Sequence, residues 1–306
     1  MIIKTSLRNL AVKALCESMT IKLMVDFMRE LVPDYNLHRR FNLSESISIP
    51  QANAAKTIVT DICDLELFPS FVQLLIDAQN KGFKGRKYRI AYLSALIRGL
   101  ELHGYIFDHE NNMFIEDARI SQSKNWGVIR EGLEYEFTFL RFDIAGNSRL
   151  VRLNETTKVT KAYQDFFNLI TKAVVRRNGR IWQLEGDGGL AAFAFQHKDT
   201  AATLSAHEIL VELLVYNHTA CPLSAPLLAR FAIHAGRHIY TSEMESLHKS
   251  EPIKEIKEIE NRYTKPNSCS ISNKVLIAVD KRVADLFSPL PERNPYGLAC
   301  YSVELS

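Results

Sequence analysis

The stretch F-L-R-F-D-I-A-G-N-S, residues 139–148, decides how the rest of the chain is interpreted. It ends an apolar, β-type run that starts at Phe137 and stops at Gly146. One acid, Asp143, stands at the end of this run. A buried carboxylate without a partner is costly, so we expect Asp143 to pair with a metal ion, a basic side chain or the amides of a helix N-terminus.

The composition is that of a globular protein with room for two domains. Of the 306 residues, 46% are hydrophobic and 24% are charged, and the net charge is +3. That charge is too small to indicate a nucleic-acid partner. No apolar run approaches the ~18 residues of a membrane-spanning helix, and the N-terminus lacks the apolar core of a signal peptide. We therefore expect a cytoplasmic protein without a membrane partner.

Cysteine usage gives no sign of a disulfide framework or a zinc site. The five cysteines are scattered along the chain, odd in number, and form no CxxC pair. Reduced thiols are the simplest interpretation.

Residues 1–116 are expected to form a mostly helical domain. Apolar residues recur every three or four positions up to Pro33, and further helices begin after Pro50 and end near Gly82 and Gly104. Two short apolar runs around Asp108–Asn112 predict a hairpin. A helix followed by a hairpin resembles the end of a winged helix, but a small helical bundle with a terminal hairpin explains it equally well. The basic residues at 81–89 are interpreted as a solvated face.

Residues 117–134 lose periodicity, and we expect a linker there. The second half, residues 135–306, then alternates strand and helix signals. Strands are predicted at 137–144, on both sides of the Gly-Asp-Gly-Gly turn at 186–189, at 227–236, in S-C-S-I-S (268–272), and at the C-terminal end. Helices are predicted at 157–178, 200–217, 250–263 and 273–287. This order predicts an α+β domain with one main sheet.

Two aspartates are expected to meet at one edge of that sheet. Asp143 ends the first strand of the domain, and Asp187 lies in the hairpin turn. In a βαββ arrangement the first strand lies beside the hairpin, which brings the strand end and the turn together. Two carboxylates together with substrate phosphates are a common way to hold Mg²⁺, and amides of residues 145–148 could contact a phosphate. An ordinary turn aspartate remains the alternative.

Three ordered motifs resemble the class III nucleotidyl cyclase catalytic domain. They are F-L-R-F-D-I-A-G-N-S (139–148), the helix and hairpin that end in L-E-G-D-G-G (184–189), and L-L-A-R-F-A-I-H-A-G (227–236). The resemblance covers residues 135–306 and implies a ferredoxin-like, antiparallel-rich sheet with flanking helices. It implies a metal-dependent enzyme that converts a nucleoside triphosphate to a 3′,5′-cyclic nucleotide and pyrophosphate.

The same resemblance implies the site. Two divalent ions, Mg²⁺ or Mn²⁺, would be held by metal-binding positions, and the nucleoside triphosphate would contact further positions. The family forms its sites across a head-to-tail homodimer, so one chain would supply the metals and its partner the remaining groups. The implied metal-binding positions are Asp143, Ile144 and Asp187, and the implied nucleotide-binding positions are Ile144, Ala145, Gly146, Asn147, Ser148, Gln183 and Arg293.

The chain departs from the family at the partner-side positions. The helix I-K-E-I-K-E-I-E, residues 253–260, matches the family pattern V-N-x-A-x-R-L-E. The ribose-orienting Asn falls on Lys254, and the Arg that stabilises the transition state falls on Glu258, whose charge is wrong for that role. The two base-reading positions fall on Gln183 and Leu247.

These departures leave two main hypotheses for the function, beside a third, a transcription regulator that uses the N-terminal helices and hairpin, which rests only on weak basic clustering. The first is an active cyclase, as a homodimer or with an unlike partner that supplies the missing groups. The second is a catalytically degenerate cyclase-fold module that binds nucleotide and metal and regulates a partner or the N-terminal regulatory or adaptor domain. For Arg230 and His234 the preferred interpretations are pairing with an acid and packing in the sheet.

Overall fold

The computed structural model describes residues 3–195, 197–241, 247–291 and 293–303. Contacts divide the chain into two compact units, Met1–Glu116 and Asp117–Ser306. Each unit has its own hydrophobic core. In the described parts of the chain, no helix combines the length and the apolar character that a bilayer crossing requires.

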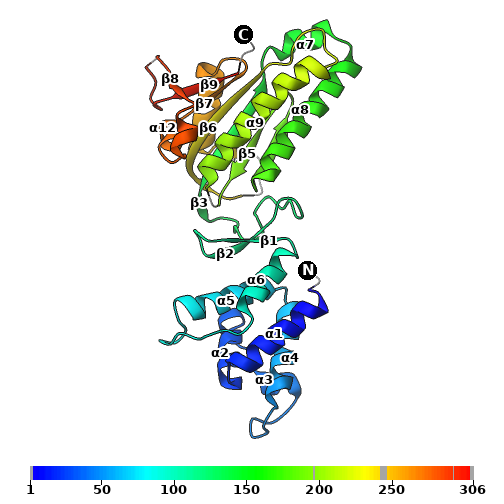
Figure 1. Ribbon diagram of the computed structural model, residues 1–306, viewed down its shortest axis with the longest axis vertical. Helices are drawn as coiled ribbons and strands as arrows, with labels where there is room; N and C mark the ends of the chain where they lie inside the picture. Colours follow the sequence, from blue (N-terminus) through cyan, green and yellow to red (C-terminus); the bar gives the residue numbers. More distant parts are fainter. Residues whose placement is uncertain (1–2, 196, 242–246, 292, 304–306) are drawn as a thin grey trace. The chain divides into compact units, whose positions relative to one another are not determined.

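The first unit is helical and ends in a hairpin, as predicted (Figure 1). Its apolar stretch before Pro33 forms two helices, because the Thr20 side chain accepts a hydrogen bond from the Leu23 N–H and starts the second. The elements are α1 (Thr5–Ser18), α2 (Ile21–Leu31), α3 (Leu37–Phe41), α4 (Gln51–Asp64), α5 (Phe68–Asn80), α6 (Leu93–Glu101), β1 (Tyr105–Asp108) and β2 (Met113–Glu116).

The second unit has the predicted α+β class, with one seven-stranded sheet. Its first part comprises β3 (Glu134–Ile144), α7 (Asn147–Leu153), α8 (Thr156–Arg176), β4 (Arg180–Glu185), β5 (Gly188–Phe193), α9 (Lys198–Thr219) and β6 (Ala229–Ile239). Its second part comprises α11 (Glu251–Glu258), the π-helix η1 (Ile259–Tyr263), β7 (Ser268–Ile271), α12 (Asn273–Leu276), α13 (Lys281–Ala284), β8 (Ser288–Pro289) and β9 (Ala299–Ser302).

The sheet order is β4-β5-β3-β6-β7-β9-β8. The hairpin β4–β5 therefore lies beside β3, as the βαββ arrangement requires. All neighbouring strands are antiparallel except β6 and β7, which are parallel. The predicted antiparallel-rich sheet is confirmed.

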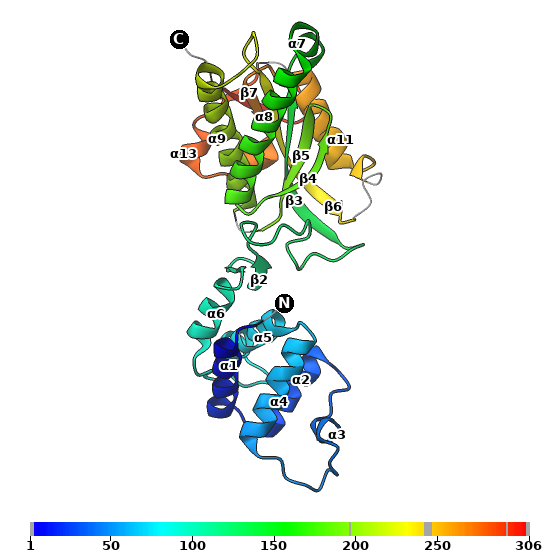
Figure 2. The same cartoon turned by 90° about the vertical axis from the view of Figure 1, so that its right-hand side faces the viewer.

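Side chains alternate between the two faces of the sheet and separate two layers. Leu140, Phe142 and Ile144 of β3 pack into the core under α8 and α9. Figure 2 shows these two helices on one side of the strands and α11 on the other. The intervening residues of β3, among them Arg141 and Asp143, consequently lie on the α11 side.

The segment expected to be a linker, residues 117–134, belongs to the second unit. Trp126 is fully buried there and packs against Phe137 and Trp182. Its indole N–H donates to the carbonyl of Asn178 at 2.7 Å. The segment has no periodic pattern, and it is held by the buried Trp126 together with the buried Ala118 and Ile129.

Two further predictions need correction or limitation. The predicted helix 273–287 is broken into α12 and α13, because the Asp280 side chain accepts a hydrogen bond from the Arg282 N–H and caps a new helix start. The predicted C-terminal strand is present as β9, and residues 304 and 305 of that prediction lie outside the described residues.

Candidate active site

The ends of β3 and β5 bring the two motif aspartates to the same edge of the sheet. Asp143 pairs across the ladder with Gly188. The N–H of Ile144 donates to the Asp187 carbonyl at 3.2 Å. Asp143 in the strand and Asp187 in the turn are therefore fixed side by side by backbone pairing, as the sequence predicted for these elements.

A glycine is required where β5 passes Asp143. A Cβ on Gly188 would stand 2.6 Å from the Phe142 carbonyl oxygen and 3.2 Å from Asp143 Oδ1. Real Cβ atoms do not come so close to a backbone oxygen, so the strand pairing itself requires glycine here.

Tyr163 of α8 lies close enough to both carboxylates to feel their charge. Burial raises the pKa of the Tyr163 phenol, and the negative charges of Asp187 and Asp143 raise it further. Its hydroxyl donates to the Asn147 side chain at the start of α7. Tyr163 therefore stays protonated and ties the predicted nucleotide-binding turn to α8.

Asp143 has a basic partner. Arg230, its neighbour on β6, donates from Nη2 to Asp143 Oδ2. The same Nη2 lies 2.8 Å from Glu260 Oε1 in η1, and Arg141 Nε lies 3.3 Å from Glu260 Oε2. The preferred interpretation of Arg230, pairing with an acid, is confirmed, and it answers why β3 tolerates a carboxylate at its end.

Glu260 is a residue that the sequence analysis did not single out. Its side chain is only 1% exposed, and it is carried by a π-helical turn, a distortion found often at functional sites. Burial raises the pKa of the Glu260 carboxyl, while the Arg230 and Arg141 charges oppose that rise. The available signal was its place as the closing Glu of the I-K-E-I-K-E-I-E motif.

The predicted phosphate-facing amides are reduced in number. The Ala145 N–H donates to the Leu228 carbonyl at 2.8 Å, and the Ile144 N–H is used by Asp187. The N–H groups of Gly146, Asn147 and Ser148 stand at the first turn of α7, where a helix has no acceptor for them. These three are the amides that a ligand could use.

The partner-side positions differ from each other in their surroundings. Lys254 is exposed on α11. Glu258 accepts a 2.8 Å hydrogen bond from the Tyr296 hydroxyl and lies 3.3 Å from Arg262. Burial, followed by this hydrogen bond, raises the pKa of Tyr296 to about 12, so the phenol remains a donor. Glu258 is thus bound within its own unit.

Gln183 of β4 lies in a small polar cluster. Its amide nitrogen donates to Glu185 at 2.7 Å and lies 3.3 Å from His248 Nε2. Lys257 Nζ lies 3.0 Å from the other ring nitrogen of His248. Leu247, which the resemblance put at the second base-reading position, is buried. His248 therefore supplies the polar group beside Gln183, one residue from the expected position.

His234 and Arg293, two further residues considered in the sequence, lie in different surroundings. His234 is buried in β6 and lies 2.9 Å from Glu255, consistent with a packing role in the sheet. Burial lowers the pKa of His234, and the Glu255 charge opposes this. Arg293 is exposed in the loop before β9, and no contact ties it to the two aspartates.

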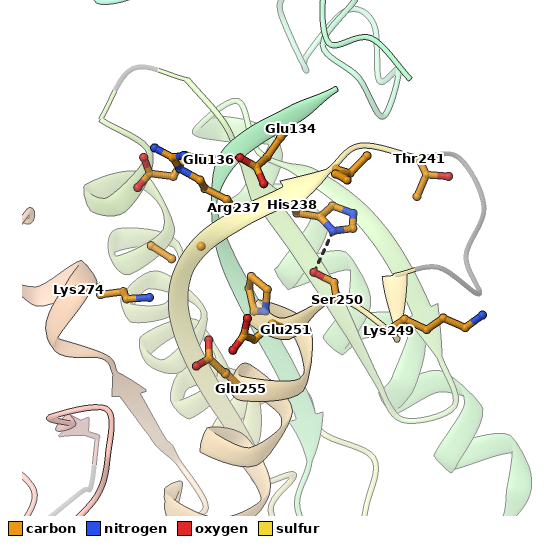
Figure 3. Close-up of a pocket in the computed structure, with 14 residues that line it drawn as sticks. Glu134, Glu136, Arg237, His238, Thr241, Lys249, Ser250, Glu251, Glu255 and Lys274 are labelled. Atoms are coloured by element: carbon orange, nitrogen blue, oxygen red, sulfur yellow. Dashed lines mark hydrogen bonds and ion pairs between the residues drawn. The ribbon is translucent and has the colours of Figure 1, made fainter. Parts of the chain in front are cut away.

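A separate pocket of about 990 Å³ opens between β6 and the start of α11 (Figure 3). His238 Nδ1 and Ser250 Oγ are 3.0 Å apart on its wall. Its charged lining residues are of both signs: Glu134, Glu136, Arg237, Lys249, Glu251, Glu255 and Lys274. None of the predicted metal or nucleotide positions lines it.

The residues at the strand edge fit a divalent cation shared with a phosphate ligand. Asp143 and Asp187 are hard oxygen donors, and Gly188 places no side chain against Asp143 Oδ1. Across the described ranges, no group of three His, Cys, Asp or Glu residues is placed to hold a metal alone. Two carboxylates are too few to surround an ion without help. They suit a Mg²⁺ ion whose remaining ligands are phosphate oxygens.

Comparisons with known proteins find similarity at the level of structure. No protein-family model matches the chain, and no curated protein matches it. The guanylyl cyclase Cya2 has 18% identity and a TM-score of 0.45, over 56% of this chain and 92% of that chain.

Two bacterial proteins give similar values. An adenylate/guanylate cyclase/hydrolase from Silicibacter pomeroyi has 21% identity and a TM-score of 0.45, over 56% of this chain and 99% of that chain. The adenylyl cyclase CyaB from P. aeruginosa has 16% identity and a TM-score of 0.45, over 57% of this chain and 96% of that chain. At these values the similarity concerns the arrangement of the chain and assigns no role to a residue.

Proposed function

We propose that the second unit is a class III nucleotidyl cyclase-like signalling domain that binds a nucleoside triphosphate with divalent metal. The observation that supports this most directly is the pairing of β3 with the β4–β5 turn, which holds Asp143 beside Asp187. If this site is active, it would convert the triphosphate to a 3′,5′-cyclic nucleotide and pyrophosphate.

The chain's own residues would divide the work as follows. Asp143, the Ile144 backbone and Asp187 would hold two divalent ions, Mg²⁺ or Mn²⁺. When bound, such ions neutralise the triphosphate and activate the attacking hydroxyl. The amides of Gly146, Asn147 and Ser148 would orient the phosphates, and Tyr163 would keep that turn in place through Asn147.

The base would be read at the cluster around Gln183. Its amide and the His248 ring can each offer a hydrogen bond to a base edge, and Lys257 adjoins them. We infer no preference among bases from this set, because amide and imidazole both donate and accept. Arg293 and the exposed Lys254 remain candidates for contacts made across a head-to-tail dimer.

A specific observation favours the second hypothesis, a module that binds nucleotide without turnover. The sequence resemblance aligns Glu258 with the family's transition-state Arg, and Glu258 is engaged by Tyr296 and Arg262. A carboxylate there cannot stabilise developing negative charge on a phosphate. An active form would need the missing cation from Lys254, Lys257 or an unlike partner chain.

The deciding experiment incubates the full chain with ATP, GTP, CTP or UTP and Mn²⁺, and measures cyclic product, pyrophosphate and nucleotide binding. Asp143→Ala and Asp187→Ala should each lower product formation by about a hundredfold or more if the site is active. Glu155→Gln is the matched control, because it removes an exposed carboxylate near α7 that pairs only loosely with Lys158.

The outcomes separate the hypotheses. Cyclic product that depends on both aspartates supports the enzyme. Metal-dependent nucleotide binding without product supports the regulatory module. Metal and nucleotide binding that survives Asp143→Ala would show that the site has been assigned to the wrong residues.

A further inference from the structure

One guanidinium serves two carboxylates at the edge of the proposed metal site. Arg230 Nη2 donates to Asp143 Oδ2 and also lies 2.8 Å from Glu260 Oε1. Asp143 belongs to β3 and Glu260 to the π-helix η1, so the arginine joins two elements that are far apart in the sequence. Asp143 is therefore already neutralised by a side chain at the place where a metal ion would have to bind.

The contact between Arg230 and Glu260 is only half formed. Arg230 Nε and Glu260 Oε1 are both buried, and neither has a hydrogen-bond partner among the described residues. The 2.8 Å approach of Nη2 to Oε1 is an ion pair without hydrogen-bond geometry. An arginine and a carboxylate pair best through two parallel N–H···O bonds, and Arg230 does not make them with Glu260 in this orientation, because its Nε has no acceptor.

We propose that Arg230 is a displaceable counter-cation, which neutralises Asp143 before metal binding and moves onto Glu260 as a two-bond pair when a divalent cation takes Asp143. Glu260 is then a positioning residue for metal binding. The inference rests on the proposed function, because it assumes that Asp143 binds the cation.

The move gives a hydrogen-bond partner to each of the two atoms that lack one. Arg230 Nε gains an acceptor and Glu260 Oε1 gains a donor, which offsets the loss of the Arg230–Asp143 bond. Without Glu260, the displaced guanidinium would be left beside a divalent cation with no carboxylate free of that cation, an unfavourable arrangement for a partly buried charge. Arg141 Nε, 3.3 Å from Glu260 Oε2, keeps the receiving carboxylate in position.

The first test measures Mn²⁺ binding to the full chain through the paramagnetic resonance signal of free Mn²⁺. Glu260→Gln should weaken Mn²⁺ binding by about tenfold or more, as loss of an outer partner does in metal sites. In an Arg230→Gln background, Glu260→Gln should have no further effect. Glu255→Gln is the matched control, because it removes the same charge from α11 and its partner, His234, is also on β6.

Each outcome decides something. Unchanged binding in Glu260→Gln overturns the inference, and so does an equal loss with and without Arg230, because Glu260 would then act through its charge alone. The variant Asp143→Asn separates failure of the proposed metal site from failure of the inference about Arg230 and Glu260. If Mn²⁺ binding depends on Asp143 while Glu260 does not matter, the proposed site stands and the inference fails. If no binding depends on Asp143, both fail.

A second measurement does not depend on the folding of a Glu260 variant. In the wild-type chain with ¹⁵N-labelled arginine, the Arg230 Nε–H resonance is assigned by its loss in Arg230→Lys. Saturating Mg²⁺ should shift this resonance downfield, because Nε gains an acceptor. A resonance that stays in place while Mg²⁺ binds overturns the inference.

Discussion

At the scale of single residues, the α11 side of the sheet is polar but closely paired. Arg230 bridges Asp143 and Glu260, His234 pairs with Glu255, and His238 contacts Ser250. Breaking one partner of a buried pair leaves the other without compensation, which is the costly case. The buried histidines are the residues of this face whose protonation would respond to mild acid.

His238 should make the second unit sensitive to acid. Burial lowers its pKa in the folded chain, so the unfolded chain takes up the proton first, near pH 6.5. The free energy of unfolding should therefore fall as the pH drops from 7 through that range. His238→Gln should reduce this slope, measured by urea unfolding followed through tryptophan fluorescence.

The control for this prediction is His109→Gln, which changes an exposed histidine of the first unit. It should leave the slope as in the wild type. The remaining slope in His238→Gln is expected from His207 and His234, whose pKa values burial also lowers. Identical slopes in wild type and His238→Gln would contradict the role given to His238.

At the scale of elements, helices and strands with a regular hydrophobic period could be predicted from the sequence, whereas contacts made by individual residues could not. The helices after Pro50, the hairpins and β3 were predictable, because each has a repeating pattern bounded by Gly or Pro. The proximity of Asp143 and Asp187 followed from strand order. Glu260 could not be found this way, because its approach to Arg230 depends on a π-helical turn. Segment 117–134 has no such pattern, and its contacts run through buried side chains such as Trp126 and through hydrogen bonds such as that from Lys124 Nζ to the Trp182 carbonyl.

Trp126→Ala should destabilise the second unit by about 3–5 kcal/mol, the usual cost of removing a large buried aromatic side chain. The indole packs on Phe137 and Trp182, and Arg180 lies over its ring. Leu133→Ala, in the same segment but exposed, is the control and should change stability by less than about 0.5 kcal/mol. Chemical denaturation monitored by circular dichroism measures both. Equal effects would restore the interpretation of this segment as a linker.

At the scale of the whole molecule, the chain contains two separate hydrophobic cores. The first core is built from helices, and the second lies between the sheet and the pair α8 and α9. Both tryptophans of the protein, Trp126 and Trp182, are in the second unit. Tryptophan fluorescence therefore reports on one unit, while circular dichroism reports on both.

A core substitution in the first unit should change the unfolding transition measured by circular dichroism and leave the transition measured by tryptophan fluorescence unchanged. Leu96 is fully buried in α6, and Leu96→Ala should cost about 2–5 kcal/mol. The circular dichroism transition should then split or move to lower temperature, while the fluorescence transition stays in place. Ile170→Ala, in the core of the second unit, should move the fluorescence transition. Coincident shifts in both signals for Leu96→Ala would show one cooperative molecule.

The parallel pairing of β6 and β7 has a consequence for how this chain can change in length. A parallel neighbour cannot be reached by a tight turn, so the chain must travel back along β6 before β7 begins. On that return, Pro252 meets Gly236, Glu255 meets His234 and Glu260 meets Arg230, in reverse order along the strand. These three contacts fix the register of the returning segment against β6. An insertion or deletion between Pro252 and Glu260 would therefore shift the later contacts out of register with β6.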